Sequence, residues 1–232
     1  MSKESFGQAI IDFTVDLAPN WTVPKGIEVL YPYDNEPTMA ALTAFYQKYY
    51  SDNRGRIAIF GINPGRFGAG ITGVPFSDPI RLEERCGIPN PFDKRQELSS
   101  VFVYDFIDAY GGGTPFYHKY FITSLCPLGF TKDGKNYNYY DDKKLEKAVL
   151  PYIVHNIRTL LDIGVSRKAC ICMGQGKNYQ FFQKLNERHQ FFDQIFPAPH
   201  PRWVMQYRLK RKAEFIQLYL DAFAKSEELL EG

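Results

Sequence analysis

The sequence predicts a three-layer α/β/α protein built around a central, mostly parallel sheet of four strands. Short apolar runs of strand length alternate along the chain with longer segments of helical periodicity, and this alternation is typical of a parallel sheet with helices on both faces. The run at residues 56–60 is apolar after its first residue and ends at Gly61. A run of this kind is expected for a central strand that is buried on both faces.

The remaining elements follow in the order that such a sheet requires. In the first half of the chain we expect helices at 6–17 and 38–50, a strand at 57–60, a helix at 98–110 and a strand at 120–125. The second half continues the alternation with a helix at 145–163, a strand at 169–173, a helix at 179–187, a strand at 194–196 and a last helix at 205–230. The last helix has a broad apolar face, which predicts that it packs on the sheet.

Length and composition are those of one globular domain. The chain has 232 residues, of which 44% are hydrophobic and 16% aromatic, so it can bury a full core. No segment has the composition of a linker, and we expect residues 1–232 to form a single domain. No run approaches transmembrane length, and residues 1–5 lack the apolar core of a secretory signal. We therefore expect no membrane partner and a cytoplasmic, monomeric protein.

The most informative stretch follows the first sheet strand and has the sequence Gly-Ile-Asn-Pro-Gly-Arg-Phe-Gly from Gly61 onwards. Asn63 then lies at the carboxyl end of the strand, where open α/β sheets bind their ligands. The glycines allow backbone amides to approach a bound group closely. Such a cluster alone is also typical of a tightly packed strand-to-helix turn, so one motif does not decide between the two readings.

A second element lies near the other end of the chain, where prolines stand on both sides of His200. The prolines stiffen this segment and hold the imidazole with little entropy left to lose, although a single histidine in a loop is more often solvated than functional. The net charge of the chain is only +2, yet positive charge is concentrated after His200, at Arg202, Arg208, Lys210, Arg211 and Lys212. This basic segment is a candidate for contact with nucleic acid.

Together, the two motifs resemble those of the uracil-DNA glycosylase superfamily, and within it the single-strand-selective monofunctional (SMUG-type) branch. The first motif of that branch is Gly-Met-Asn-Pro-Gly, against Gly-Ile-Asn-Pro-Gly at 61–65, and the second begins with His-Pro, as at 200–201. The likeness extends to residues 29–33, to Thr-Gly-Val-Pro-Phe at 72–76 and to the strand at 121–128, and it covers roughly residues 6 to 222. It implies the fold of that superfamily, DNA as the partner, and removal of uracil or a related deaminated or oxidised base.

The resemblance implies catalytic roles for Asn63 and His200. Asn63 would accept a hydrogen bond from the attacking water and aim it at the anomeric carbon, whereas His200 would donate to the base O2, where negative charge develops. Backbone amides near Ile62 and Gly65 would supply further donors. No lysine matches either motif, so we expect no Schiff base, no strand cleavage and no cofactor.

Recognition of the base is expected in a pocket that stacks on one face of the flipped base and hydrogen-bonds its polar edge. Phe76 matches the stacking phenylalanine of the family, although an aromatic residue in an apolar loop is often part of a core. The family has an asparagine before Leu-Cys-Pro-Leu to read the uracil edge, and this chain has Ser124 there. Serine is shorter and lacks the paired amide groups. We therefore expect a broader or shifted base specificity, unless Ser124 makes no contact with the base.

The second motif also departs from the family, whose His-Pro-Ser-Pro-Arg becomes His-Pro-Arg-Trp at 200–203. The family holds the base out of the duplex by inserting a side chain into the vacated stack, and Arg202, Trp203 and Met205 all have suitable chemistry. Stacking of a tryptophan on a base contributes about 1–3 kcal/mol, and the alternative role of Trp203 is to anchor the last helix. Arg202 and Trp203, with Arg208 and Lys210, are the candidate DNA-binding residues.

Other features of the sequence leave alternatives open. Gly174-x-Gly176 follows a strand and opens a helix, but the third glycine of a dinucleotide fingerprint is missing; a nucleotide-using enzyme is one alternative, and a non-catalytic nucleic-acid-binding protein is another. The polar and aromatic stretch at 133–142 is either a solvated loop or a contact with DNA. The four cysteines lack the spacing of metal ligands, so we expect buried thiols and no metal site or iron-sulfur cluster.

Overall fold

The central sheet has four parallel strands, as predicted, and their order is β3-β2-β6-β7. The computed structural model describes residues 4–19 and 21–231. The strands are Arg56–Gly61 (β2), Tyr120–Ser124 (β3), Val165–Met173 (β6) and Gln194–Ala198 (β7). Because the strands are parallel, their carboxyl ends meet at one edge of the sheet, where ligands bind in folds of this class.

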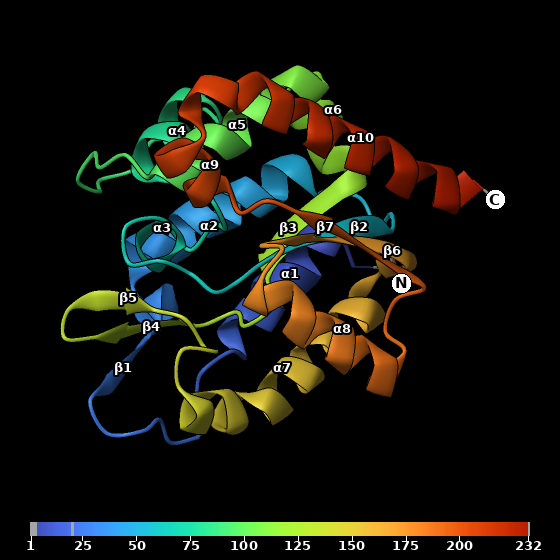
Figure 1. Ribbon diagram of the computed structural model, residues 1–232. Coiled ribbons are helices and arrows are strands. Elements are labelled where there is room, and N and C mark those ends of the chain that lie inside the picture. Colours follow the sequence, from blue (N-terminus) through green and yellow to red (C-terminus); the bar gives the residue numbers. More distant parts are fainter. Residues whose placement is uncertain (1–3, 20, 232) are drawn as a thin grey trace.

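Helices cover both faces of this sheet (Figure 1). On one face lie α5, α6 and α10, and on the other lie α1, α7 and α8, with α2 packed against α1 and α6. The bounds are Phe6–Val15 (α1), Glu36–Tyr49 (α2), Leu98–Tyr110 (α5), Gly113–Lys119 (α6), Lys143–Ile163 (α7), Lys177–His189 (α8) and Lys212–Glu231 (α10). These three layers confirm the predicted α/β/α architecture.

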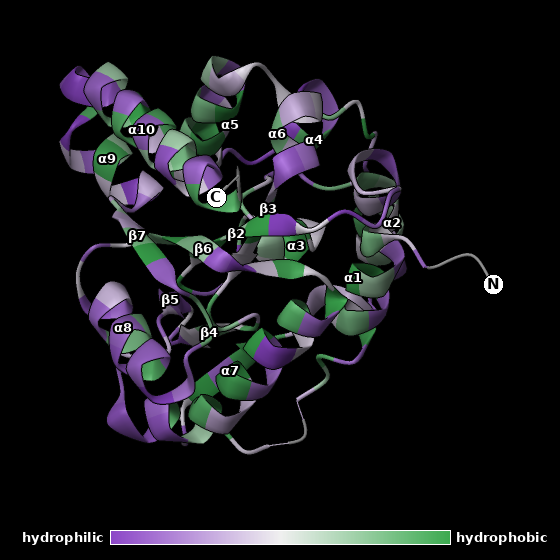
Figure 2. Ribbon diagram, turned by 90° about the vertical axis from the view of Figure 1, so that its right-hand side faces the viewer, coloured by the Kyte–Doolittle hydropathy of each residue, from purple (hydrophilic) through white to green (hydrophobic). Residues whose placement is uncertain are grey.

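The core lies between the sheet and the two helical layers. Every residue of β2 and β3 is buried, which explains why these strands are apolar runs without alternation. Hydrophilic residues dominate α8 and alternate with hydrophobic residues along α7 and α10 (Figure 2), as expected for helices with one face in the core. The register places Gly61 opposite Ser124 and Met173 opposite Ala198. The segments that follow the strands therefore start next to one another.

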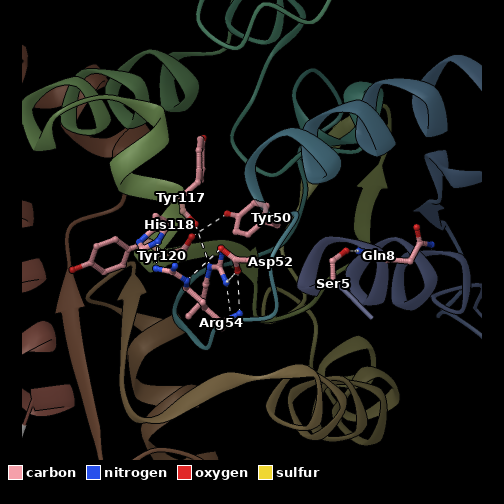
Figure 3. A network of polar contacts seen from close by, with 9 residues as sticks. Ser5, Gln8, Tyr50, Asp52, Arg54, Tyr117, His118 and Tyr120 are labelled. Carbon is pink, nitrogen blue, oxygen red and sulfur yellow. Dashed lines mark hydrogen bonds and ion pairs between the residues drawn. The ribbon is translucent and has the colours of Figure 1, made fainter. Parts of the chain in front are cut away.

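A buried arginine fixes the opposite, amino end of the central strand. Arg56 is fully buried, and its guanidinium donates to Asp52 at 2.7 Å and to the carbonyl oxygens of Arg54 and Tyr117 at 2.6 and 3.3 Å. The same guanidinium lies over the ring of Tyr50. Figure 3 shows Tyr50, Asp52, Arg54 and Tyr117 gathered at this end of the sheet. The buried charge is thus paired and hydrogen-bonded, which is the condition for tolerating a charge in the core.

A second, antiparallel sheet was not predicted. It has the order β1-β4-β5, and its strands are Ile27–Leu30, Gly129–Lys132 and Lys135–Tyr137. Asp133 and Gly134 form the tight turn between β4 and β5, and both have positive φ, as the favoured two-residue hairpin turns require. The stretch at 133–142, which we expected to be a solvated loop or a DNA contact, therefore begins in a hairpin.

The chain after β7 differs from the single helix predicted at 205–230. A short helix, Pro201–Tyr207 (α9), begins at the second motif, and a 3-10 turn at Leu209–Arg211 separates it from α10. Proline is favoured at the first helical position because its fixed φ suits a helix and its missing N–H needs no partner there. His200 is therefore the N-cap residue of a helix. Further short elements that were not predicted are Pro32–Asp34 (3-10), Ala69–Thr72 (α3) and Pro79–Glu84 (α4).

The described part of the chain contains neither a membrane-spanning helix nor a cluster of metal ligands. None of its helices combines the length and the apolar character that crossing a bilayer requires. All four cysteines are free and buried. Within residues 4–19 and 21–231, no three His, Cys, Asp or Glu side chains come together as a metal site would require.

Candidate active site

One cavity opens at the edge where the carboxyl ends of the parallel strands meet. It has a volume of about 350 Å³, which lies at the lower end of the range for small-molecule sites. Its walls come from the loop after β2, the end of β3, the start of α5, α9 and residues 135–139, which contain β5 and are called the β5 segment below. All catalytic and base-binding residues predicted from the sequence line this cavity, namely Ile62, Asn63, Gly65, Phe76, Ser124 and His200.

The side chain of Asn63 is held from both ends of its amide. Its Nδ2 donates to the carbonyl oxygens of Tyr137 and Pro64, at 3.2 and 3.3 Å, and its Oδ1 accepts from the backbone N–H of Tyr139 at 3.2 Å. This network determines which end of the amide carries the oxygen. A carbonyl oxygen has a second lone pair, so Asn63 Oδ1 can still accept a hydrogen bond from a water in the cavity.

Tyr139 is itself anchored in the core. Its side chain is fully buried, and its hydroxyl donates to Asn178 Oδ1 at 2.7 Å. Asn178 in turn donates to the carbonyl oxygen of Met173, the last residue of β6, at 3.3 Å. The amide of Asn63 is therefore oriented relative to the ends of β2 and β6 before any ligand binds, which is the kind of preorganisation that catalysis uses.

His200 occupies the N-cap position of α9, shortly after β7 ends. Its Nδ1 accepts from the backbone N–H of Arg202 at 3.2 Å, so the neutral imidazole carries its proton on Nε2. Burial, and then the positive charge of Arg202, lowers the pKa of His200 to about 4. The Tyr219 hydroxyl donates to the carbonyl oxygen of Pro199 at 2.6 Å and fixes the preceding residue. His200 is therefore a neutral, positioned hydrogen-bond donor near pH 7.

Phe76 has a backbone conformation that few side chains adopt. Its φ is 55°, in the left-handed region, which costs about 1 kcal/mol or more for a residue other than glycine. The Thr72 hydroxyl holds this turn by donating to the carbonyl oxygen of Ser77 at 2.7 Å. The ring packs against Gly61, where a Cβ would lie 2.7 Å from it, and its centroid is 6.1 Å from that of His200. Strain that is retained in a cavity wall is typical of functional sites.

Ser124 and Gly65 contribute to other parts of the same cavity. Ser124 is the last residue of β3 and is only 7% exposed. Gly65 follows Asn63 on the glycine-rich loop, and a Cβ there would lie 3.2 Å from Glu97 Oε1 and 3.3 Å from Asn136 Nδ2. Any larger residue at position 65 would therefore crowd the wall, which explains the second glycine of the motif.

The candidate DNA-binding residues divide into two groups. Arg202 and Trp203 line the cavity, whereas Arg208 and Lys210 are exposed on the adjoining surface and do not line it. Trp203 is 39% exposed and packs edge-on against Phe215 of α10, with ring centroids 5.8 Å apart. The Arg208 guanidinium lies 4.8 Å from the Trp203 ring centroid. Trp203 is therefore both a contact of the last helix and a part of the cavity wall.

Glu97 lines the cavity and was not predicted as a site residue. It is the N-cap residue of α5, but its side chain makes no capping hydrogen bond. The carboxyl group instead occupies the space over Gly68, where a Cβ would overlap it. Burial raises the pKa of Glu97, and the negative charge of Asp78 adds to the rise. A lone glutamate before a helix gives no indication in the sequence that it approaches the glycine-rich loop.

Asn136 and Asn138 also line the cavity and were not predicted. They come from the β5 segment, whose neighbours Tyr137 and Tyr139 hold Asn63. The polar stretch at 133–142 is thus part of the site. The clue in the sequence was its content of asparagine and tyrosine, but the pairing with distant strands that brings it to the cavity has no local pattern.

The Gly174-x-Gly176 loop lies beside the candidate active site. It lines a neighbouring cavity of about 280 Å³, which shares Ile62, His200 and Trp203 with the first. The loop precedes α8, but the third glycine of a dinucleotide fingerprint is absent, because Tyr179 stands there. The geometry therefore makes this loop an extension of the same site.

Comparison with known proteins agrees with the fold and the cavity. The model of the uracil DNA glycosylase superfamily matches residues 47–224. A solved structure, described as the crystal structure of WT Pedobacter heparinus SMUG2, is 45% identical in sequence and has a TM-score of 0.94. The match covers 97% of this chain and 100% of that chain. A comparison with curated proteins gives no match.

These matches bear on the alternatives left open by the sequence. The family model covers more than half of the chain and contains both motifs, and the solved structure matches over nearly the whole length. A non-catalytic nucleic-acid-binding protein and a nucleotide-using enzyme are therefore not favoured. The chain belongs to the uracil DNA glycosylase superfamily, in its SMUG-type branch, and is a uracil-DNA glycosylase of base excision repair.

Proposed function

We propose that this glycosylase is monofunctional, so that it hydrolyses the N-glycosidic bond and leaves the DNA strand intact. The observation that carries the proposal is the presence of Asn63 and His200 in one cavity whose lining residues, in the described chain, include no lysine. Lys177 lines only the neighbouring cavity, where its Nζ lies over the Tyr140 ring. Cleavage of the strand requires an amine nucleophile that forms a Schiff base with the sugar. The nucleophile is therefore water, and the product is an abasic site.

Asn63 positions this water. Its amide has no useful basicity, but its Oδ1 is oriented by the N–H of Tyr139 and retains a lone pair for a second hydrogen bond. The sugar acquires oxocarbenium character as the bond to the base breaks, so a weak nucleophile suffices when it is held in line with the anomeric carbon. Positioning, and not deprotonation, is the contribution of Asn63.

His200 stabilises the departing base. Its Nε2–H donates to the base O2, where negative charge grows during bond cleavage. With a pKa of about 4, the imidazole is neutral at physiological pH and is already held by the N–H of Arg202. A donor that needs no reorganisation at the moment of reaction typically contributes about 3 kcal/mol. Backbone amides near Ile62 and Gly65 add to this stabilisation.

Phe76 and Ser124 shape the base pocket. The target base leaves the helical stack and lies against the Phe76 ring, in the manner of other base-flipping enzymes. Ser124 offers one hydroxyl to the base and leaves more room than an asparagine would. We therefore expect uracil as a substrate, with deaminated purines such as xanthine and hypoxanthine as further substrates.

Arg202 and Trp203 line the cavity, and we propose that one of them enters the vacated stack. Trp203 is restrained by its contacts with Phe215 and Arg208, which favours Arg202 as the inserted residue. Arg208 and Lys210, on the adjoining surface, would contact phosphates. The two catalytic candidates line one cavity together with the residues of the base pocket, so a single chain can hold the whole site. We propose that the protein works as a monomer, in the cytoplasm.

An assay on lesion-containing oligonucleotides tests the proposal. The purified protein is incubated with labelled strands that carry a single uracil, xanthine or hypoxanthine, and each product is divided between alkali and neutral buffer. We expect breaks in the uracil strand after alkali only, and no covalent adduct on treatment with borohydride. Breaks in neutral buffer together with a borohydride adduct would show lyase activity and contradict a monofunctional mechanism.

A further inference from the structure

Ser124 alone cannot hold the polar edge of a flipped uracil. That edge is an imide, in which one N–H lies between two carbonyl oxygens. Ser124 has a short side chain that is only 7% exposed, and a hydroxyl cannot present a donor and an acceptor side by side as an amide does. A site that discriminates between bases needs its own polar groups matched to those of the substrate. An amide that reads this edge therefore has to come from another wall of the cavity.

Asn136 and Asn138 reach the cavity from the β5 segment. Side chains two residues apart in an extended chain point to the same side, and both asparagines line the cavity. Tyr139, the next residue along, has its ring fully buried in the core. The β5 segment thus presents amides to the cavity and aromatic packing to the protein interior.

The two asparagines differ in what their amides already bind. Asn136 Oδ1 accepts from the backbone N–H of Arg66 at 3.1 Å, so its oxygen is committed to the glycine-rich loop. Asn138 bonds through its backbone, whose N–H donates to Asp141 Oδ2 at 2.9 Å and whose carbonyl accepts from the Asp141 N–H at 3.0 Å. Within residues 4–19 and 21–231, no hydrogen bond engages the Asn138 side chain. Its amide offers one acceptor and two donors to the cavity.

The backbone on both sides of Asn138 is fixed to the catalytic candidate. The carbonyl of Tyr137 accepts from Asn63 Nδ2, and the N–H of Tyr139 donates to Asn63 Oδ1. Asn138 is the residue between these two anchor points, and its side chain is half-buried. The backbone of Asn138 is therefore held at a defined position relative to Asn63, as the backbone of a residue that recognises a base must be.

We propose that Asn138 is the specificity-determining residue of this glycosylase. Its Oδ1 accepts from the imide N–H of the flipped base, and its Nδ2 donates to a neighbouring carbonyl oxygen, so that it supplies the amide that Ser124 lacks from a different wall of the cavity. Uracil and xanthine both carry an imide. Cytosine has an unprotonated ring nitrogen and an amino group at this edge and would require the opposite orientation of the amide. The inference rests on the proposed function of the cavity.

The test compares single-turnover excision of uracil and of 3-methyluracil, which lacks the imide N–H. We expect the wild type to prefer uracil by about tenfold or more, because an unpaired polar group in a buried site is costly. Asn138→Ala should lose most of this preference. Asn138→Asp keeps the size of the side chain, but a carboxylate cannot donate to the carbonyl oxygen, and it should release uracil about tenfold more slowly.

A second-site change distinguishes recognition from a merely structural role. If Asn138 supplies an amide, adding Ser124→Asn to Asn138→Ala should restore the preference for uracil. Asn136→Ala should keep the ratio of the rates on uracil and 3-methyluracil. Asn53 is exposed on the loop before β2, and Asn53→Ala should leave both rates unchanged.

Two outcomes overturn the inference. One is an equal fall on both substrates in Asn138→Ala that Ser124→Asn does not rescue. The other is that Asn138→Ala keeps the wild-type preference for uracil over 3-methyluracil. If the wild type releases no uracil at all, the proposed function fails and the inference fails with it. If the wild type releases uracil but Asn138→Ala leaves the ratio of the rates on uracil and 3-methyluracil unchanged, only the inference fails.

Discussion

The side-chain oxygen of Asn63 accepts a hydrogen bond from the backbone N–H of Tyr139, 76 residues further along the chain. This bond joins the loop after the central strand to the segment that follows the β4–β5 hairpin. The small antiparallel sheet thus has a function in the site, because it orients the residue that positions the attacking water. The catalytic loop and its support fold from separate parts of the chain.

Gly61→Ala tests whether the Phe76 ring must lie where it does. A Cβ at position 61 would stand 2.7 Å from this ring, so the ring has to leave its present position in the cavity wall. We expect uracil release to fall about tenfold, because base–aromatic stacking contributes about 1–3 kcal/mol. Single-turnover rates measure the effect. Gly55→Ala, just before the amino end of β2, is the matched control, and an equal loss there would show that the effect is one of stability.

The lowered pKa of His200 predicts a dependence of stability on pH. The pKa is about 4 in the folded protein and about 6.5 in an unfolded chain. Between these values the unfolded state binds more protons, so the free energy of unfolding falls as the pH is lowered from 6.5 to 4. The full effect is about 3 kcal/mol.

Urea unfolding at several pH values measures this effect against a matched variant. His200→Asn retains an N-cap acceptor for the N–H of Arg202 but does not titrate. The difference in unfolding free energy between wild type and variant should therefore change with pH only below about 6.5. A constant difference between pH 4 and pH 7 would mean that His200 titrates normally in the folded protein.

Arg208 and Lys210 are expected to contact DNA phosphates without contacting the base. Replacing either by alanine should weaken binding to all DNA sequences and reduce the slope of log affinity against log salt by about one unit per lost contact. Titrations at several salt concentrations measure the slope. Lys168 is an exposed lysine on β6, and Lys168→Ala is the control. Slopes equal to that of the wild type would leave these residues as solvated surface.

Asp52→Ala tests the anchor at the amino end of β2. The change leaves the fully buried guanidinium of Arg56 without its carboxylate partner, although the carbonyls of Arg54 and Tyr117 remain. Because Asp52 is partly exposed, we expect the free energy of unfolding to fall by about 1–3 kcal/mol. This is less than for an ion pair in which both partners are buried. Denaturant unfolding measures it. Adding Arg56→Met should recover part of the loss, and no recovery would contradict the role of the buried charge.

The sequence alone predicted the elements whose pattern is local. The four parallel strands are short apolar runs, and their alternation with helices is sufficient to predict the layers. Asn63 could be found because it stands at the carboxyl end of a strand, where this class of sheet binds ligands. Ser124 and His200 could be found because the segments around them resemble motifs of the family, and His200 also because prolines stand on both sides of it.

The elements that were missed depend on contacts between distant parts of the chain. Strands β4 and β5 are short and partly polar. Strand β5 pairs with β4, and β4 pairs with β1, about 100 residues earlier, where the register joins Leu30 to Gly129. The sequence of β4 and β5 resembles that of a loop, so Asn136 and Asn138 were predicted only as part of a solvated or DNA-contacting stretch and not as residues of the base pocket. Glu97 reaches the cavity by the packing of α5. The start of α9 was missed because histidine is not among the usual N-cap residues.

The most direct test of the account is the single-turnover release of uracil by wild type, Asn63→Ala and His200→Ala, with DNA affinity measured alongside. Both side chains act mainly on the transition state, so each change should lower the rate by about a hundredfold or more. The affinity for uracil-containing DNA should change little. A rate for Asn63→Ala close to that of the wild type would contradict the proposed mechanism.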